Sequence, residues 1–185
     1  SGNKATATYH EAISYYESLA KAYPDQAKLL SYGKTDFGKP LHLLVLSKAG
    51  LFEPAKIKAT DKRVLLINNG IHPGEPEGID ASMMLARDLL KNQKLPNNVV
   101  ICIIPVYNID GCFNRTSTSR ANQNGPLAYG FRGNSKNYDL NRDFIKTDSK
   151  NSAAFQQIFN IWKPEIFVDT HTSNGADYQY TMTLI

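Results

Sequence analysis

A chain of 185 residues with 42% apolar and 21% charged residues has the composition of a globular domain, which excludes disordered and collagen-like classes. The formal net charge of +4 and the pI near 9.0 would suit a polyanionic partner, but Lys and Arg are scattered without a basic stripe, so we expect no nucleic-acid binding. No apolar run is long enough to span a membrane and no linker composition is present, so residues 1–185 are predicted to form a single domain.

The first part of the chain predicts a helix and a hairpin. Apolar residues spaced by three and four over residues 9–23 predict an amphipathic helix. Two strand-like runs, 28–33 and 41–46, flank a turn-rich segment and predict a hairpin at a sheet edge. His42 within the second run is interpreted as a structural or surface residue, and residues 49–62 as a polar loop.

The middle of the chain predicts a strand, a helix and a second strand. Residues 63–68 form a β-branched and Leu-rich run, and residues 77–90 repeat apolar side chains at helical spacing after Pro76, which suits the first turn. Residues 98–106 form another apolar run. Such a unit is normally parallel and right-handed, so we expect an α/β fold with a mixed, mostly parallel central sheet flanked by helices.

The last part of the chain begins with a long connection. Residues 107–150 are rich in Asn, Gly, Ser and Arg, and a connection of this length in a compact domain is usually functional or disordered; the motifs within it favour function. A helix over 152–162, a strand over 165–170 and a further strand over 178–185 follow. The chain breaks off within that last strand, so we expect the native protein to continue.

Two features bear on the cellular compartment. Ser1 and Gly2 resemble an expression remnant in front of a mature chain, so we expect a periplasmic or secreted protein whose export signal is not in this sequence. The two cysteines, Cys102 and Cys112, are too few for a disulfide framework and lack a CxxC spacing. They are read either as buried thiols or as one bridge.

Candidate metal ligands follow two of the predicted strands. His72 and Glu75 come directly after the run 63–68, and His171 comes after the run 165–170. Open α/β sheets keep their sites at the carboxyl ends of strands, and two His with one Glu is the ligand set of a catalytic zinc that leaves one position to water. Asp169 is available to accept the second N–H of an imidazole. The alternative is that Glu75 only caps the following helix.

The long connection also carries arginines. Arg120, Arg132 and Arg142 are spread over it, together with the motifs Asn108–Gly111 and Asp139–Arg142. A planar guanidinium meets both oxygens of a carboxylate at once, so these residues are candidates for binding an acidic substrate group. The alternative is a solvated basic loop.

The order of these motifs resembles the zinc metallocarboxypeptidase family, the carboxypeptidase A and B kind. The segment 32–41 also resembles the start of that catalytic domain, so the likeness covers nearly the whole chain, as the N-terminal portion of the domain. The motifs that carry the resemblance are HxxE at His72 and Glu75, Asn-x-Asp-Gly at 108–111, Asp-Leu-Asn-Arg at 139–142 and Asp-x-His at 169–171.

The resemblance implies a role for each motif residue. One Zn²⁺ ion would be held by His72, Glu75 and His171. The terminal carboxylate of a peptide or peptide-like substrate would be gripped by Asn141 and Arg142.

Three further side chains take supporting roles by the same resemblance. Arg132 would polarise the scissile carbonyl and stabilise its oxyanion, with Arg120 as the second candidate. Asp139 would stand behind the first zinc histidine, as Asp169 does behind the second.

The implied reaction is hydrolysis of the C-terminal peptide bond by a zinc-activated water, whose proton passes to a carboxylate. In the family this general base is a glutamate well downstream of the third ligand, and the chain ends fourteen residues after His171. Glu77 and Glu165 do not replace it, since one enters a helix and the other lies at the far end of a strand. We therefore expect the chain to bind zinc but to hydrolyse peptides poorly or not at all.

Two other functions stay open. A zinc-dependent deacylase of N-acyl amino acids would share the HxxE motif, the Asp-Leu-Asn-Arg motif and a later histidine, although residues 9–48 resemble the peptidase. A non-catalytic module could use the zinc site and Arg142 to bind peptide ends. A glutamate far downstream in the full gene would favour the enzyme.

Overall fold

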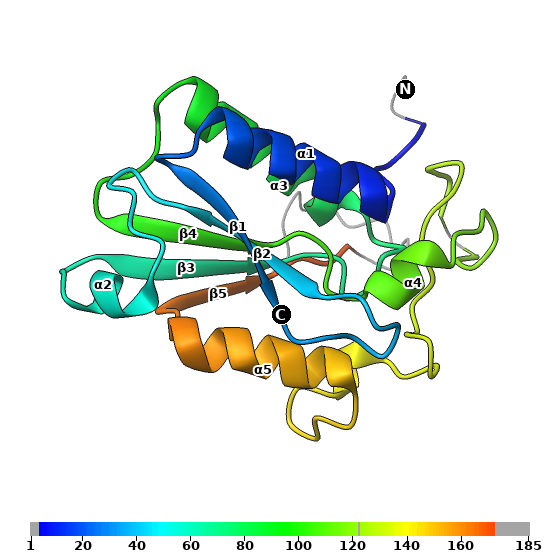
Figure 1. Cartoon of the computed structure of the whole chain (residues 1–185). Coiled ribbons are helices and arrows are strands. Elements are labelled where there is room, and N and C mark those ends of the chain that lie inside the picture. Colours follow the sequence, from blue (N-terminus) through cyan, green and yellow to red (C-terminus); the bar gives the residue numbers. More distant parts are fainter. Residues whose placement is uncertain (1–3, 122, 173–185) are drawn as a thin grey trace, which may run out of the picture.

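The computed structural model describes residues 4–121 and 123–172, which form a five-stranded sheet in the order β1-β2-β4-β3-β5 (Figure 1). The strand β2 pairs antiparallel with both neighbours, whereas β4, β3 and β5 are parallel, so every described strand except β2 runs in one direction. The expected mixed, mostly parallel α/β sheet is therefore confirmed. The predicted strand over 178–185 lies outside the described residues. The strands are β1 (Ala27–Tyr32), β2 (Leu41–Leu46), β3 (Arg63–Asn68), β4 (Val99–Ile104) and β5 (Ile166–Asp169).

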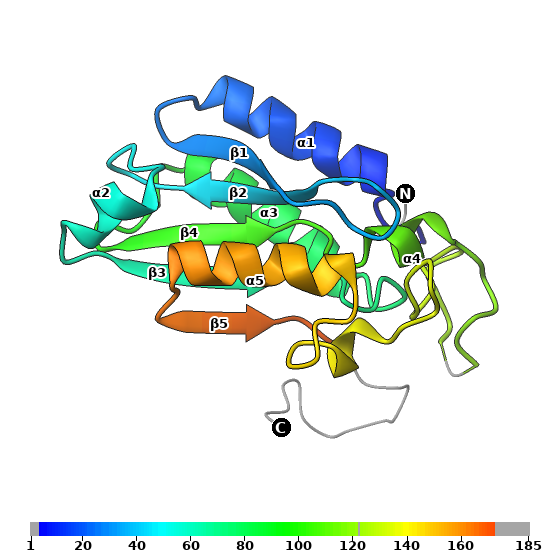
Figure 2. The same ribbon diagram turned by 60° about the horizontal axis from the view of Figure 1, so that its bottom comes forward.

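Helices cover both faces of the sheet. The helices α1 and α3 lie on one face and α5 lies on the other (Figures 1 and 2). None of the helices in the described part of the chain is long and apolar enough to cross a membrane. The helices are α1 (Tyr9–Ala22), α2 (Pro54–Lys58), α3 (Glu77–Lys91), α4 (Ile109–Phe113) and α5 (Lys150–Trp162), with one turn of 3-10 helix, η1 (Leu140–Arg142).

The two covered faces explain why the central strands read as continuous apolar runs. Alternate residues of β2 point to opposite sides: Leu44 packs in the cluster that contains Leu90 of α3, and Leu43 in the cluster that contains Phe155 of α5. All four side chains are buried. A strand that is covered on both faces buries every side chain, so its polar and apolar residues do not alternate.

The structure differs from the predictions at several boundaries. The segment 49–62 is not only loop, because α2 forms within it and buries Ile57. The connection 107–150 holds α4 and η1. The strand β4 ends before Pro105, whose nitrogen has no hydrogen to donate to a neighbouring strand. Pro76 precedes α3 as its N-cap and does not form its first turn.

The predicted cysteine alternatives are resolved. Cys102 and Cys112 are both free and buried. Burial raises the pKa of the Cys112 thiol to about 11, so it stays protonated at neutral pH.

The parallel strands place the candidate site. Asn68 of β3 is in register with Asp169 of β5, so the two strands end side by side. The turn 71–75 leaves the first of these ends and His171 follows the second. The connection between β4 and α5, with α4 and η1, gathers at the same end of the sheet (Figure 2).

Candidate metal centre

A tight turn after β3 carries the first two candidate ligands. Gly70 has a φ of 67°, and a Cβ there would lie 2.9 Å from Cδ1 of Ile79, so only glycine fits without strain. The backbone N–H of Glu75 donates to the carbonyl of His72 at 2.9 Å and closes the turn. His72 and Glu75 are each 3% exposed, so both enter the site as buried, rigidly held groups.

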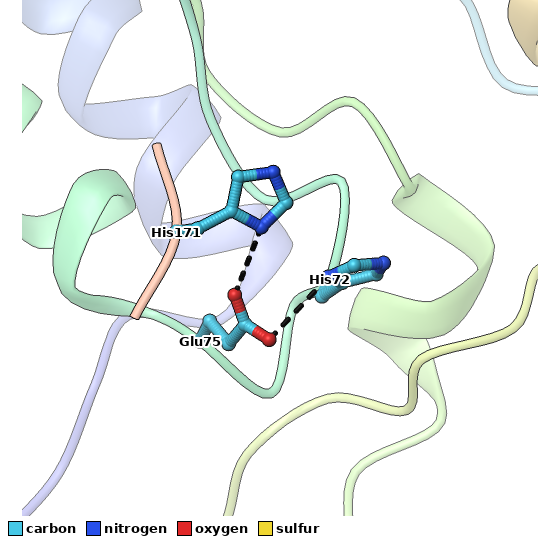
Figure 3. A group of neighbouring side chains, drawn as sticks. All are labelled: His72, Glu75 and His171. Carbon is cyan, nitrogen blue, oxygen red and sulfur yellow. Dashed lines mark hydrogen bonds and ion pairs between the residues drawn. The ribbon is translucent and has the colours of Figure 1, made fainter. Parts of the chain in front are cut away.

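Three predicted ligands converge at this point. Nδ1 of His72 lies 3.4 Å from one oxygen of Glu75, and Nδ1 of His171 lies 3.1 Å from the other (Figure 3). One donor atom from each residue lies within 4.8 Å of the other two. The alternative that Glu75 caps α3 does not hold, because that helix has no side-chain cap and the carboxylate faces the imidazoles.

The far nitrogen of each imidazole is bonded to a carboxylate. Nε2 of His72 lies 3.0 Å from Asp139, and Nε2 of His171 lies 2.9 Å from Asp169. A carboxylate accepts only, so each Nε2 carries a hydrogen, and in a neutral ring the lone pair is then on Nδ1. The Nδ1 atoms of both rings face the Glu75 carboxylate. Without a metal, Nδ1 can carry a second hydrogen that donates to Glu75, and in a neutral ring its lone pair would be available to a cation, which is the arrangement that carboxylate-supported metal histidines adopt.

The charges at the site favour a cation between these atoms. Burial alone would raise the pKa of Glu75, but hydrogen bonds from His171, His72 and the Thr172 N–H outweigh it and hold the pKa well below its usual range. The bonds to Asp169 and Glu75 raise the pKa of His171 to about 9. At neutral pH His171 is therefore protonated and donates one hydrogen bond to each of the two carboxylates. A metal cation would take the place of the hydrogen on Nδ1, which faces Glu75.

The two candidate catalytic arginines make different contacts. Arg120 lies 2.9 Å from an oxygen of Glu75, with 16% of its side chain exposed. Arg132 lies 2.9 Å from Asp139, with 43% of its side chain exposed, and its Nη1 is 3.4 Å from Nδ1 of His72. Arg120 thus lies inside the site against a candidate ligand, whereas Arg132 lies at its rim.

The carboxylate of Asp139 connects the metal centre to the predicted substrate residues. Asp139 is the N-cap of η1 and accepts the backbone N–H of Asn141 at 3.0 Å. The exposed side chain of Arg142 donates to the Asn141 carbonyl at 2.9 Å. The bonds from His72, Arg132 and Asn141 outweigh the effect of burial and lower the pKa of Asp139.

Two buried asparagines support the site and had no assigned role in the sequence reasoning. Asn68 donates to the second oxygen of Asp169 at 2.9 Å. Asn108 donates to the carbonyl of Arg132 at 2.9 Å and caps α4 by accepting the Gly111 N–H. The available signal for Asn68 was an amide at the end of an otherwise apolar strand, and for Asn108 it was the Asn-x-Asp-Gly motif itself.

The donor set fits zinc. Zinc binds imidazole nitrogen and carboxylate oxygen at about 2.0–2.2 Å, which places tetrahedral ligands about 3.4 Å from one another. The distances of 3.4 Å and 3.1 Å from the two imidazoles to Glu75 are close to that spacing. His72, Glu75 and His171 are therefore the residues that would hold the ion.

Known proteins are similar to this chain in sequence and in fold. Residues 12–178 match the sequence profile of the family described as zinc carboxypeptidase. Carboxypeptidase 2 of Trichophyton tonsurans is 30% identical over 152 residues, which are 77% of this chain and 25% of that protein. Carboxypeptidase D of Drosophila melanogaster is 29% identical over 150 residues, or 75% of this chain and 10% of that protein. The chain thus spans about a quarter of the length of the Trichophyton relative.

Solved structures share the fold. A metallo-carboxypeptidase from Burkholderia cenocepacia aligns with a TM-score of 0.70 at 20% identity, over 94% of this chain and 43% of that chain. Bovine thrombin-activatable fibrinolysis inhibitor, solved in complex with tick carboxypeptidase inhibitor, aligns with a TM-score of 0.69 at 18% identity, over 94% of this chain and 62% of that chain.

Proposed function

The chain belongs to the zinc carboxypeptidase family, and from that premise we propose that its protein is a metallocarboxypeptidase that hydrolyses the C-terminal peptide bond of peptides. The family predicted from the motifs is thereby confirmed, while the activity is our proposal. The observation that carries it is the meeting of two Nδ1 atoms and one carboxylate at the ends of β3 and β5.

We also propose that the protein acts in the periplasm or outside the cell. Fractionation of the native source tests this location.

We propose that His72, Glu75 and His171 hold one Zn²⁺ ion. When bound, zinc supplies a Lewis acid that lowers the pKa of a water toward ~7. The protein prepares the donors: Asp139 and Asp169 keep the hydrogens of both imidazoles on Nε2, and Arg120 holds one oxygen of the ligand carboxylate.

We propose that Asn141 and Arg142 bind the terminal carboxylate of the substrate. Arg142 is exposed, so its guanidinium is accessible to a ligand, and a carboxylate is the anion that its fork of donors fits. The turn that bears both residues is bonded to Asp139, which also holds His72. Recognition of the chain end is thereby tied to the metal centre.

We propose that Arg132 polarises the scissile carbonyl and stabilises the oxyanion. Its Nη1 lies beside the metal-facing nitrogen of His72, at 3.4 Å, and its partner Asp139 fixes the plane of the guanidinium through two donors. Arg120 remains the second candidate. Its contact with Glu75 instead favours a role in orienting that ligand.

The general base is not evident among the described residues. Within 4–121 and 123–172, the two carboxylates that contact Nε2 of the proposed ligand histidines, Asp139 and Asp169, are occupied in holding those rings. Glu165 accepts the N–H of Val64 at 2.7 Å, at the opposite end of the sheet. We therefore propose that this 185-residue chain binds zinc and peptide ends but turns over peptides slowly or not at all.

The test measures zinc binding and peptide hydrolysis for this chain and for the full-length gene product. We expect one zinc ion per molecule in both, and chelator-sensitive release of C-terminal residues by the full-length protein. His72→Ala should remove both properties. Wild-type protein without zinc, or with equal zinc in the His72→Ala variant, would refute the proposed site.

Other results of the same test would favour the two alternative functions, a deacylase or a non-catalytic binding module. Release of amino acids from N-acyl amino acids, but not from peptides, would make the protein a deacylase. Zinc and peptide-end binding without hydrolysis by the full-length protein would make it a binding module. Steady chelator-sensitive turnover by the 185-residue chain would overturn the proposal that its base is missing.

A further inference from the structure

The turn that carries Asn141 and Arg142 is bracketed by two aspartates, and the family resemblance gives the second of them no role. Asp139 precedes η1 and Asp143 follows it. The N–H of Arg142 donates to the carbonyl of Asp139 at 2.9 Å, and the N–H of Asp143 donates to the carbonyl of Leu140 at 3.1 Å. Both aspartates thus belong to the hydrogen-bonded frame of the turn.

The side chain of Asp143 is buried among donors at the start of α5. Its Oδ2 accepts the hydroxyl of Ser149 at 2.6 Å, the N–H of Ser149 at 3.0 Å and the hydroxyl of Ser152 at 2.6 Å. Its Oδ1 accepts the N–H of Asp148 at 2.8 Å. Asp143 is only 3% exposed, so this carboxylate is an anchor to the helix and not a surface group.

The anchor extends into the core. The hydroxyl of Ser152 lies 3.0 Å from the hydroxyl of Tyr107, and both residues are fully buried. Ser149 is the N-cap of α5, so the donors that hold Asp143 are themselves placed by the helix. The far end of the turn is therefore fixed to α5, while its near end is fixed to the metal centre through Asp139.

We propose that Asp143 is a positioning residue that sets where Asn141 and Arg142 stand for binding the terminal carboxylate of the substrate. The inference rests on the proposed function. Because the side chain of Asp143 bonds to residues 148–152 at the start of α5, whereas His72 is bonded to Asp139, Asp143 acts on substrate recognition and not on the metal. Asp139 by contrast contacts both His72 and the turn.

Asparagine is a close steric match that cannot replace this carboxylate. Four donors surround Asp143, and both of its oxygens accept. In Asp143→Asn one oxygen becomes an NH₂ group, which would point a donor at a donor. The turn then loses at least one of the four bonds that attach it to the start of α5, while the volume of the side chain is kept.

The experiment measures the affinity of the full-length gene product for an N-acylated dipeptide with a free terminal carboxylate and for the same dipeptide as a C-terminal amide. Zinc affinity is measured in parallel by competition with a chelator. For Asp143→Asn we expect binding of the acid to weaken by about 10- to 100-fold, the range expected when hydrogen bonds to a charged group are lost. Binding of the amide and zinc affinity should change by less than about twofold.

Two further variants separate positioning from general destabilisation. Ser152→Ala removes one of the four donors and should weaken binding of the acid in the same direction but by less. Ile158→Val trims a fully buried side chain of α5 without touching the turn, and should leave the preference for acid over amide unchanged. Where turnover is measurable, Asp143→Asn should raise KM for the peptide acid with kcat nearly unchanged.

The outcomes are distinct. If Asp143→Asn keeps the wild-type preference for acid over amide, or loses it only to the extent that Ile158→Val does, the inference is wrong. A fall in zinc affinity for Asp143→Asn would also overturn it. If the wild-type protein itself binds no zinc or does not prefer the acid, the proposed function fails, and the positioning role fails with it.

Discussion

The two imidazoles of the metal centre have the same chemical support but are held by different parts of the fold. The Asp169 that supports His171 is the last residue of β5, in register with Asn68 of the neighbouring strand. The Asp139 that supports His72 lies in the connection between β4 and α5. His171 and Asp169 are therefore placed by the sheet, and we call them the sheet half of the site. His72 and Asp139 are linked through the connection, and we call them the loop half.

The sheet half is held by short-range polar bonds at the ends of two strands. Asp169 accepts the amide of Asn68 at 2.9 Å, and the N–H of Thr170 donates to the Asn68 carbonyl at 3.1 Å. Asn68 is fully buried, and the side chain of Asp169 is 18% exposed. Its geometry follows from the pairing of the strands.

The loop half is held by charge. Asp139 receives two guanidinium donors from Arg132, and these side chains are 29% and 43% exposed. The same Asp139 accepts the N–H of Asn141 on the proposed substrate turn. The comparison indicates that the sheet half supplies rigidity, whereas the loop half connects the proposed metal centre to the proposed substrate turn.

The largest expected effect is on zinc affinity and comes from removing the ligand histidine of either half. His72→Ala and His171→Ala should each reduce zinc affinity by more than the ~100-fold upper range for a supporting residue, because a donor atom itself is lost. His42→Ala is the matched control, since His42 lies in β2 and contacts Tyr9, and it should retain zinc. Chelator competition measures the three variants. Zinc affinity that survives either ligand substitution would show that the half concerned does not bind the ion.

The next effect separates the two supporting carboxylates. Asp139→Asn and Asp169→Asn should each lower zinc affinity by about 10- to 100-fold, because the imidazole loses its orienting acceptor. Only Asp139→Asn should also weaken binding of a peptide acid, since Asp139 alone of the two contacts the substrate turn. Calorimetry with zinc and then with peptide measures both. Equal effects of the two variants on peptide binding would remove the distinction between the halves.

A smaller effect, on the free energy of unfolding, comes from the residues that bond to those carboxylates, Asn68 and Arg132. Asn68→Ala should lower the free energy of unfolding by about 1–3 kcal/mol, because it leaves an oxygen of the partly buried Asp169 carboxylate without its partner. Arg132→Gln should cost less than about 1 kcal/mol, since an exposed ion pair contributes little. Urea unfolding of the metal-free protein measures both changes. A larger loss for Arg132→Gln would mean that the loop, and not the sheet, carries the stability.

The smallest effect is the pH dependence of the stability that Asp143 contributes as the anchor of the substrate turn. Hydrogen bonds from Ser149, Ser152 and Asp148 outweigh burial and lower the pKa of Asp143. A carboxyl whose pKa is lower in the folded state stabilises it above the unfolded value of ~3.9, and that stability is lost as pH falls through the folded pKa. The stability difference between wild type and Asp143→Asn should therefore be largest near neutral pH and shrink below about pH 4.

Urea unfolding at several pH values measures this difference. Asp148→Asn is the control, because its carboxylate is 54% exposed and pairs with Lys146 at the surface, so its removal should change stability little. A difference for Asp143→Asn that stays constant down to pH 3 would show that the charge of Asp143 is not part of the anchor.

Much of the fold could be predicted from the sequence because its signals are local. The helix α1 and the strands β3 and β4 follow from the spacing of apolar residues within each segment. The short helix α2 was missed because five residues carry too little periodicity to stand out from a polar loop. The turn after β3 and the position of His171 after β5 follow from the rule that sites lie at the carboxyl ends of parallel strands.

The support of the site could be predicted only in part. Asp139 and Asp169 were expected from the motifs, but the Asn68 that holds Asp169 is 101 residues from it, and no pattern within either segment reports that contact. Asp143 follows a recognised motif without belonging to it. Its role becomes visible only with Ser149 and Ser152 around it, because a carboxylate is defined as an anchor by the donors that meet it.

The sequence by itself determined which donor atoms the protein offers to the proposed metal, namely two imidazoles and one carboxylate, each following the end of a strand. The tertiary structure decided how these donors face one another. The contact of His72 with Asp139 spans 67 residues, and that of His171 with Glu75 spans 96. These long-range contacts keep Nδ1 of each imidazole toward Glu75, because the orientation of a ring depends on what accepts its other hydrogen, and that acceptor comes from packing between distant segments.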